Sequence, residues 1–257
     1  MPPASLTSKE MSVGVSMSVT LGDVKSVGPK LVPFFKTVTL FFILYGGGDS
    51  KPGFIYVVFK CLPIISLIFF VLLHGMNFSE VYYYSRRVLI GLIFSCIGDI
   101  GMAYKDHGYF LPAIGMFAMA QVMYATAFGF RPFRPYHGLV VFGIGLTLLS
   151  CILPNIAYGP LPVFGVIYCL LICLMLWRAV ARVQLFDDLW TWTKLCSCVG
   201  AILFIISDSV IAIDKFHTKI PFAQNIIMTT YYAAQLGITL SVVDSQVDAL
   251  LEGKKTN

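Results

Sequence analysis

Four ionisable side chains interrupt long apolar stretches of this sequence and are the residues best placed to do chemistry: Lys36, Lys60, Asp99 and Asp208. A charged group at the centre of a bilayer costs on the order of 2.5–3.5 kcal/mol on insertion scales, so each should face a bundle interior or a cavity. Carboxyl groups held in such places can serve as an acid and a base. We therefore predict that Asp99 and Asp208 are the working groups.

Three of these residues lie at a similar depth in their apolar segments. At a rise of about 1.5 Å per residue, Asp99 and Asp208 lie roughly 8–10 Å before the ends of their segments, and Lys60 lies as far after the start of its own. We expect one polar chamber near a single face of the bundle. The alternative is that Lys60 pairs with one aspartate only to fix helix register, which leaves the second acid unexplained. For Lys36 the alternative is a side chain that extends to the head groups.

Uncharged polar side chains in two later apolar segments add to this set. Gln121 and Tyr124 are three residues apart, and Tyr231 and Gln235 are four apart, so each pair shares a helix face. Together with Tyr232, we predict that these residues bind a substrate. The alternative is ordinary hydrogen bonding between helices, which is the default role of such groups in a membrane.

The composition indicates which elements position these groups. The chain has 257 residues, of which 58% are hydrophobic and 12% charged, and its mean hydropathy is +0.82; soluble domains carry roughly 25% charged residues. Runs such as 64–73 are continuously apolar, which favours membrane helices over the alternating strands of a barrel. We predict an all-α polytopic transmembrane bundle of eight spans, at approximately 31–45, 54–75, 88–104, 109–130, 136–153, 160–180, 195–213 and 222–243.

Lysine and arginine residues in the connections predict the orientation of the spans. Eight spans place twelve basic residues on one side and four on the other, so both termini are expected in the cytoplasm. Residues 1–23 lack the basic and apolar regions of a cleavable signal peptide and are expected to form a disordered tail. The membrane domain is then 24–245, followed by a cytoplasmic C-terminal tail at 246–257.

A weak internal repeat relates the two acidic segments. Asp99 is followed after 25 residues by Tyr124, and Asp208 is followed after 24 residues by Tyr232. In an eight-span protein both hairpins have the same orientation, so the pattern indicates a parallel duplication. Chance similarity between apolar helices is the alternative. A duplication would place Asp99 and Asp208 at corresponding positions beside the interface of the halves.

Several other classes of protein are excluded. The net charge of +5 comes from basic residues scattered between apolar runs, so we expect no nucleic acid partner. The seven cysteines lie almost wholly in apolar runs and are expected to be reduced packing residues. The chain has no G-x-S-x-G elbow and no H-E-x-x-H or similar ligand cluster. We expect neither a metal nor a cofactor, and the sequence specifies no oligomeric state.

Several short motifs, in their order and spacing, resemble those of the YhhN-type lysoplasmalogenases, most of all the animal form placed in the endoplasmic reticulum membrane. They are residues 28–36 (GPKLVPFFK), 60–63 (KCLP), 98–99 (GD), 207–208 (SD) and 231–235 (YYAAQ), and the likeness covers about Val24 to Ser245. The resemblance implies hydrolysis of the vinyl ether bond of lysoplasmalogens to a fatty aldehyde and glycerophosphoethanolamine or glycerophosphocholine. The implied partner is a lysophospholipid substrate taken from the bilayer.

The implied reaction suits the two aspartates. Protonation of the vinyl β-carbon gives an oxocarbenium ion that water attacks, which requires one acid and one carboxylate, as in glycosidases. Asp99 and Asp208 would be this pair, with their roles unassigned by the sequence. Lys60 with Lys36 would hold the phosphate, and the tyrosines and glutamines would orient glycerol or water. A proton-coupled transporter is the main alternative, because intramembrane charges and internal repeats are typical of such carriers; a non-catalytic lipid sensor is another.

Overall fold

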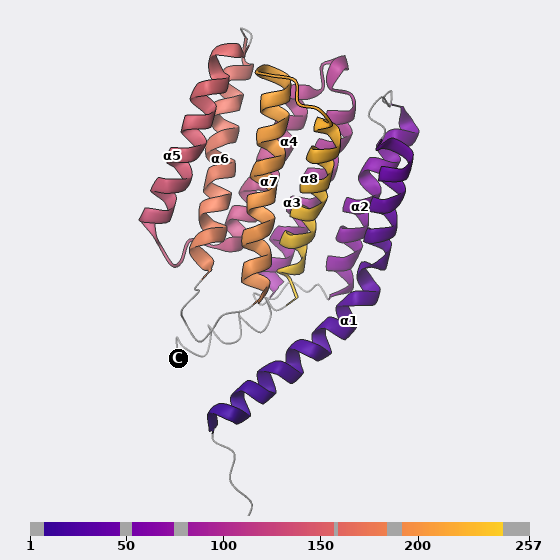
Figure 1. Ribbon diagram of the computed structural model, residues 1–257, viewed down its shortest axis with the longest axis vertical. Coiled ribbons are helices and arrows are strands. Elements are labelled where there is room, and N and C mark those ends of the chain that lie inside the picture. Colours follow the sequence, from indigo (N-terminus) through magenta and orange to yellow (C-terminus); the bar gives the residue numbers. More distant parts are fainter. Residues whose placement is uncertain (1–7, 47–52, 75–81, 157–158, 184–191, 244–257) are drawn as a thin grey trace, which may run out of the picture.

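The computed structural model of the chain is a bundle of long helices (Figure 1). It describes residues 8–46, 53–74, 82–156, 159–183 and 192–243, and their side chains from Val27 onward. Within these ranges the elements are α1 (Ser8–Tyr45), α2 (Phe54–Leu73), α3 (Tyr83–Ala103), η2 (Lys105–His107), α4 (Phe110–Phe128), α5 (Pro135–Ile152), η3 (Leu153–Asn155), α6 (Leu161–Arg182), α7 (Trp192–Phe216) and α8 (Ala223–Leu240).

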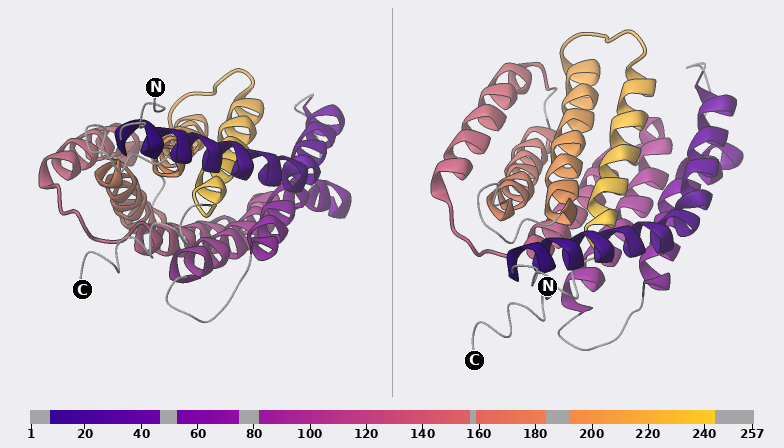
Figure 2. Two further views of the ribbon diagram at one scale, coloured as in Figure 1. Left: turned by 90° about the horizontal axis from the view of Figure 1, so that it is seen from below. Right: turned by 60° about the horizontal axis from the view of Figure 1, so that its bottom comes forward.

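The helices pack in the same order in the two halves of the chain. Successive helices contact each other from α1 to α4 and again from α5 to α8. The halves meet at two places, where α4 packs on α6 and where α8 packs on α2. These two contacts are equivalent, because α4 corresponds to α8 and α6 corresponds to α2 in the other half. Helices α2, α3, α4, α6, α7 and α8 therefore form a closed ring, with α1 outside on α2 and α5 outside on α6 (Figures 1 and 2). This arrangement supports the predicted parallel duplication and extends it to four helices per half.

Each of the eight predicted spans coincides with one helix, which confirms the polytopic helical class. Six described segments are long and apolar enough to cross a bilayer, and they belong to α1, α2, α4, α5, α6 and α7. The other two helices are more polar: α3 carries Arg86, Arg87 and Asp99, and α8 contains threonine, tyrosine and glutamine. Both lie within the ring, between α2 and α4 and between α7 and α2. Their polar groups can therefore meet other helices instead of lipid.

Helix α1 begins earlier than the sequence predicted. It starts at Ser8, so residues 8–23, for which a disordered tail was predicted, are helical. No proline lies between Pro3 and Pro29 to stop the helix. Pro29 and Pro33 lie inside it, and such residues bend helices. The first part of α1 turns away from the line of α2 and crosses below one end of the bundle, while the rest packs along α2 (Figures 1 and 2). The boundaries of the membrane domain at 24 and 245 stay predictions, and the predicted C-terminal tail at 246–257 lies outside the described residues.

Two glycines allow α7 and α8 to approach closely. A Cβ on Gly237 would lie 2.8 Å from the carbonyl oxygen of Cys196, and one on Gly200 would lie 2.8 Å from the carbonyl oxygen of Ala234. Any larger residue would push the backbones apart, and small residues at such crossings are typical of membrane helices. The close crossing fixes the α7–α8 hairpin, which carries Asp208 on its first helix.

Candidate active site

Asp99 of α3 is the centre of a buried cluster built by three helices. The Nζ atom of Lys60 on α2 lies 3.2 Å from Asp99 Oδ1 and 3.3 Å from the Asp99 backbone oxygen. The hydroxyl of Tyr231 on α8 donates to Asp99 Oδ2 at 2.7 Å. Tyr232 donates to the backbone oxygen of Lys60 at 2.8 Å, which holds α8 against α2. Both oxygens of the Asp99 carboxylate therefore have a partner, and one of these partners is a cation.

Asp208 of α7 is hydrogen-bonded to a tyrosine, whereas Asp99 is paired with a lysine. The hydroxyl of Tyr168 on α6 donates to Asp208 Oδ2 at 2.5 Å. The adjacent Ser207 donates to the backbone oxygen of Ile227 at 3.1 Å and so fixes this part of α7 against α8. Within the described residues, the ion pairs found are Lys60–Asp99 and Lys219–Asp214, and Asp208 takes part in neither. Asp208 is therefore a carboxyl group without a neighbouring cation in this part of the chain.

Lys60 and Tyr168 occupy corresponding positions in the two halves. Lys60 precedes Asp99 by 39 residues, and Tyr168 precedes Asp208 by 40. In each half the partner comes from the second helix and the acid from the third. The duplicated architecture thus presents two carboxyl groups whose partners differ in charge.

A polar cavity of about 490 Å³ contains both acids. Lys60, Asp99, Asp208 and Tyr231 all contribute to its wall. The two carboxyl groups therefore share one space. Exposed residues of η2 and of the α7–α8 end also line the cavity, so it opens at this end of the bundle. A polar substrate group entering from this end would meet both carboxyl groups.

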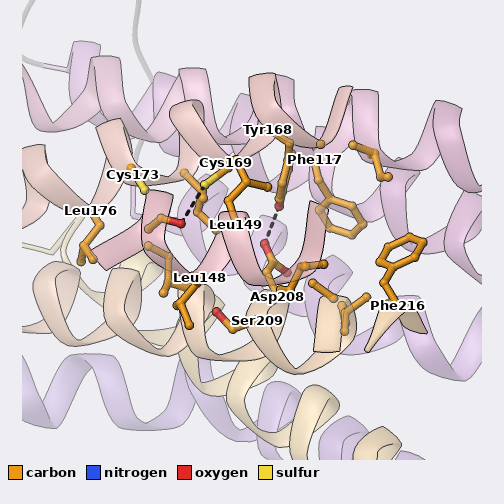
Figure 3. A pocket seen from close by; sticks show the side chains of 18 of the residues that line it. Phe117, Leu148, Leu149, Tyr168, Cys169, Cys173, Leu176, Asp208, Ser209 and Phe216 are labelled. Carbon is orange, nitrogen blue, oxygen red and sulfur yellow. Dashed lines mark hydrogen bonds between the residues drawn. The ribbon is translucent and has the colours of Figure 1, made fainter. Parts of the chain in front are cut away.

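A second cavity of about 240 Å³ lies between α4, α5, α6 and α7 and has almost entirely apolar walls (Figure 3). Asp208 and Tyr168 point into it among leucine and phenylalanine side chains (Figure 3). Ile144 and Leu148 of α5 line this cavity and are also exposed, so it reaches the outer, lipid-facing surface. Five residues line both cavities: Met102, Phe110, Phe117, Asp208 and Ile211. Asp208 therefore stands where the polar and apolar spaces meet.

Three of the predicted substrate-binding residues, Gln121, Tyr124 and Gln235, are fully buried between helices. Tyr124 donates to Gln235 Oε1 at 2.8 Å, and both side chains are fully buried. Gln121 lies beside Tyr168, and its amide has no hydrogen bond of ordinary length within the described residues. None of the three lines either cavity. Their geometry is that of hydrogen bonding and packing between helices, which was the alternative interpretation of these residues. Their role in substrate binding stays a prediction.

Lys36 is separated from the other predicted site residues. Its side chain is exposed on α1 and lines neither cavity. A long basic side chain on an outer helix can extend to the head groups, which was the alternative for this residue. The structure thus brings Lys60, Asp99, Asp208 and Tyr231 to one cavity and leaves Lys36 apart.

Sequence reasoning did not include Tyr168 among the candidate site residues, nor the lysines at the opening of the polar cavity. Tyr168 could have been found by extending the repeat backward, since its separation from Asp208 nearly equals that of Lys60 from Asp99. The lysines ended their spans and were used only to predict orientation. No group of three or more histidine, cysteine, aspartate or glutamate side chains that could hold a metal occurs in the described part of the chain.

A bundle of apolar membrane helices with two acids lining one internal cavity defines a polytopic membrane protein with an intramembrane polar site. Ionisable residues in such a position generally mark a functional site, such as a proton relay or a substrate path. The chain belongs to the YhhN family, whose model matches residues 55–242. The matched range runs from the second residue of α2 past the end of α8, and it includes Lys60, Asp99, Tyr168 and Asp208.

The chain is similar over most of its length to proteins that carry the name lysoplasmalogenase. It is 43% identical to lysoplasmalogenase TMEM86A of Bos taurus over 223 residues, which cover 87% of this chain and 92% of the relative. Identity to lysoplasmalogenase TMEM86A of Homo sapiens is 40% with the same coverage. Lysoplasmalogenase TMEM86B of Sus scrofa is 33% identical over 219 residues, which cover 85% and 88% of the two chains. No solved structure matches the chain. The family indicated by the sequence motifs is confirmed.

Proposed function

We propose that this chain is a lysoplasmalogenase that hydrolyses the vinyl ether bond of lysoplasmalogens, releasing a fatty aldehyde and a glycerophosphoethanolamine or glycerophosphocholine. The observation that carries the proposal is the pair of acids, Asp99 and Asp208, that faces one cavity in a member of this family. The relatives named lysoplasmalogenase support the choice of bond. An internal carboxyl pair is suited to the acid–base chemistry that this bond requires.

The different partners of the two aspartates favour different roles. Asp208 has no cation beside it in the described part of the chain, and an unpaired charge against apolar walls is costly, so we assign it the proton. Asp99 is paired with Lys60 and is assigned the carboxylate form. Asp208 is then the general acid, and Asp99 is the base that activates water and stabilises the cation. Tyr168 and Tyr231 would hold the two carboxyl groups in place.

This assignment gives a balanced cycle. The Asp208 proton adds to the β-carbon of the vinyl ether, and the resulting oxocarbenium ion is attacked at the α-carbon by water, whose proton passes to Asp99. The product is a hemiacetal. Its carbon–oxygen bond to glycerol then breaks as Asp99 returns its proton to the departing oxygen and Asp208 takes the proton of the hemiacetal hydroxyl. Aldehyde and glycerophospholipid leave, and both aspartates regain their starting forms.

The two cavities suit the two ends of such a substrate. The glycerol end would occupy the polar cavity and the alkenyl chain the apolar one, which places the double bond beside Asp208 at their junction. The chain would enter laterally past the exposed Ile144 and Leu148. Because the β-carbon belongs to the chain side of the bond, its proton donor should lie on the apolar side. Water would approach from the polar side, where Asp99 lies.

The test is turnover by the full-length protein purified in detergent, given lysoplasmenylethanolamine in D₂O. Released aldehyde would be reduced at once to the alcohol and measured by mass spectrometry. We expect one deuterium on the carbon next to the former carbonyl, because the proton donor exchanges with solvent. Asp208→Asn and Asp99→Asn should each abolish aldehyde release. Since Asp99→Asn leaves Lys60 unpaired, Lys60→Met/Asp99→Asn is the variant that tests catalysis with the pair removed.

Two controls make the result specific. The ester-linked lysophospholipid of the same chain length should stay intact, because it has no carbon–carbon double bond to protonate at this position. Lys30→Gln changes a lysine of α1 at the opposite end of the bundle and should turn over like the native protein. Absence of aldehyde from folded native protein would remove the proposal, and flux of intact lipid into proteoliposomes would then favour a transporter.

We further propose that the protein resides in the endoplasmic reticulum membrane with both termini in the cytoplasm, so that the polar cavity opens to the lumen. The excess of basic residues on the terminal side supports this orientation. Epitope tags at the two ends should be digested by protease added to intact microsomes. Protection of either tag would contradict the orientation.

A further inference from the structure

Five charged side chains surround the opening of the polar cavity: Lys105, Asp106, Asp214, Lys215 and Lys219. Lys219 Nζ lies 3.3 Å from Asp214 Oδ2, and the backbone N–H of Ile220 donates to the other oxygen of Asp214 at 3.0 Å. These two charges are already compensated. The remaining three, Lys105, Asp106 and Lys215, form no ion pair with any other described residue. Among the described residues, the opening thus offers two cations and one anion that have no ion-pair partner.

We propose that this opening is the binding site for the zwitterionic head group, with Lys105 and Lys215 holding the phosphate and Asp106 holding the ammonium group. The proposal rests on the proposed function for the identity of the lipid and assigns the head group to residues that lie away from the catalytic acids. A phosphate monoanion with an attached ammonium group complements two cations and one anion. Lys60 is a weaker candidate for the phosphate because Asp99 already engages its Nζ atom.

The position of Lys215 agrees with the length of the substrate. Asp208 and Lys215 are seven residues apart, two turns on the same face of α7, and both line the polar cavity. At 1.5 Å per residue the offset is about 10 Å. Seven bonds join the phosphorus to the vinyl β-carbon, and an extended chain that advances about 3.5 Å per three bonds spans about 8 Å. A phosphate bound to Lys215 therefore places the β-carbon within reach of Asp208.

Lys215 is also held at the border of the two spaces. Its Nζ atom lies 3.2 Å from the ring centre of Phe110, and Phe110 lines both cavities. A cation over an aromatic face is attracted to it, so the ammonium group stays near the opening without a carboxylate partner. Lys105, Asp106 and Lys215 all line the same cavity, so the three charges share one opening.

The test is binding of uncleavable ligands in which a saturated 1-O-alkyl ether replaces the vinyl ether. Three head groups of the same chain length would be compared by microscale thermophoresis: phosphoethanolamine, phosphate alone, and hydroxyl. We expect affinity to decrease in this order. Lys105→Gln and Lys215→Gln should each weaken binding of the phosphoethanolamine ligand about threefold to tenfold and hardly change binding of the hydroxyl ligand. Asp106→Asn should weaken only the phosphoethanolamine ligand, by a similar factor.

The control is Lys30→Gln, which removes a lysine at the opposite end of the bundle and should leave all three affinities unchanged. Equal affinities of the native protein for the three ligands would overturn the proposal, as would variants that weaken all three ligands alike. These measurements need no turnover, so they stand even if the protein releases no aldehyde. With turnover, Lys215→Gln should raise KM and leave kcat nearly unchanged; a fall in kcat at constant KM would contradict a binding role.

Discussion

Replacing Lys60 with methionine is the substitution whose effect on stability follows most directly from the geometry. The side chains of Lys60 and Asp99 are 6% and 3% exposed, and their charged atoms are 3.2 Å apart. Removing one member of a buried pair costs about 3–5 kcal/mol because the other charge is left without compensation. The Tyr231 hydroxyl would still donate to Asp99, and a hydrogen bond of this kind retains about 1 kcal/mol. We therefore expect Lys60→Met to lower the free energy of unfolding by about 2–4 kcal/mol.

The double variant Lys60→Met/Asp99→Asn separates stability from catalysis. Removing both charges is often nearly neutral, so we expect its free energy of unfolding to lie within about 1 kcal/mol of the native value. It should nevertheless release no aldehyde. Reversible unfolding in mixed micelles gives the stability, and aldehyde release gives the activity. A double variant as unstable as the sum of the two single variants would refute the coupling, and full turnover by Lys60→Met would refute the assigned role of the pair.

Three further predictions concern other positions. Tyr168→Phe removes a hydrogen bond to Asp208 and should lower kcat about tenfold without unfolding the protein. Tyr168→Lys should abolish turnover, because a cation would hold Asp208 as the carboxylate. Measurements of kcat and of the unfolding midpoint test both expectations. Gly237→Leu should destabilise the protein by about 1–3 kcal/mol because α8 touches α7 there, while Gly143→Leu, which has open space, should not; unfolding measures the difference. Arg178→Met should lower the unfolding free energy by about 2–4 kcal/mol, since this buried guanidinium donates to two carbonyl oxygens of the α4–α5 connection.

The spans could be predicted from the sequence because lipid leaves the backbone few choices. Predicted spans 54–75 and 160–180 became α2 (Phe54–Leu73) and α6 (Leu161–Arg182), with ends displaced by two residues or fewer. The start of α1 could not be predicted in this way. Apolar length identifies only the part of a helix that lies in lipid, whereas α1 continues from Tyr45 back through Pro33 and Pro29 to Ser8.

The two acids could be predicted because a charge stands out in an apolar run. Tyr168 could not, because tyrosine is common in membrane helices and its partner lies 40 residues away on another helix. Lys105 and Lys215 could not be predicted as site residues either, because lysines are common at the ends of membrane spans and do not by themselves indicate a binding site. Their relevance follows from the cavity that they line, which depends on how six helices pack.

The correspondence of Lys60 and Tyr168 explains how a duplicated bundle can provide an acid and a base. Two symmetric halves would give two carboxyl groups the same surroundings, and both would tend to be in the same protonation state. Here the second helix of each half supplies the partner, and the partner is a lysine in one half and a tyrosine in the other. The cation favours the carboxylate form of Asp99, and the neutral hydroxyl does not impose that form on Asp208. In the proposed mechanism, this one difference between equivalent positions divides the roles and assigns the proton to the acid that also borders the apolar cavity.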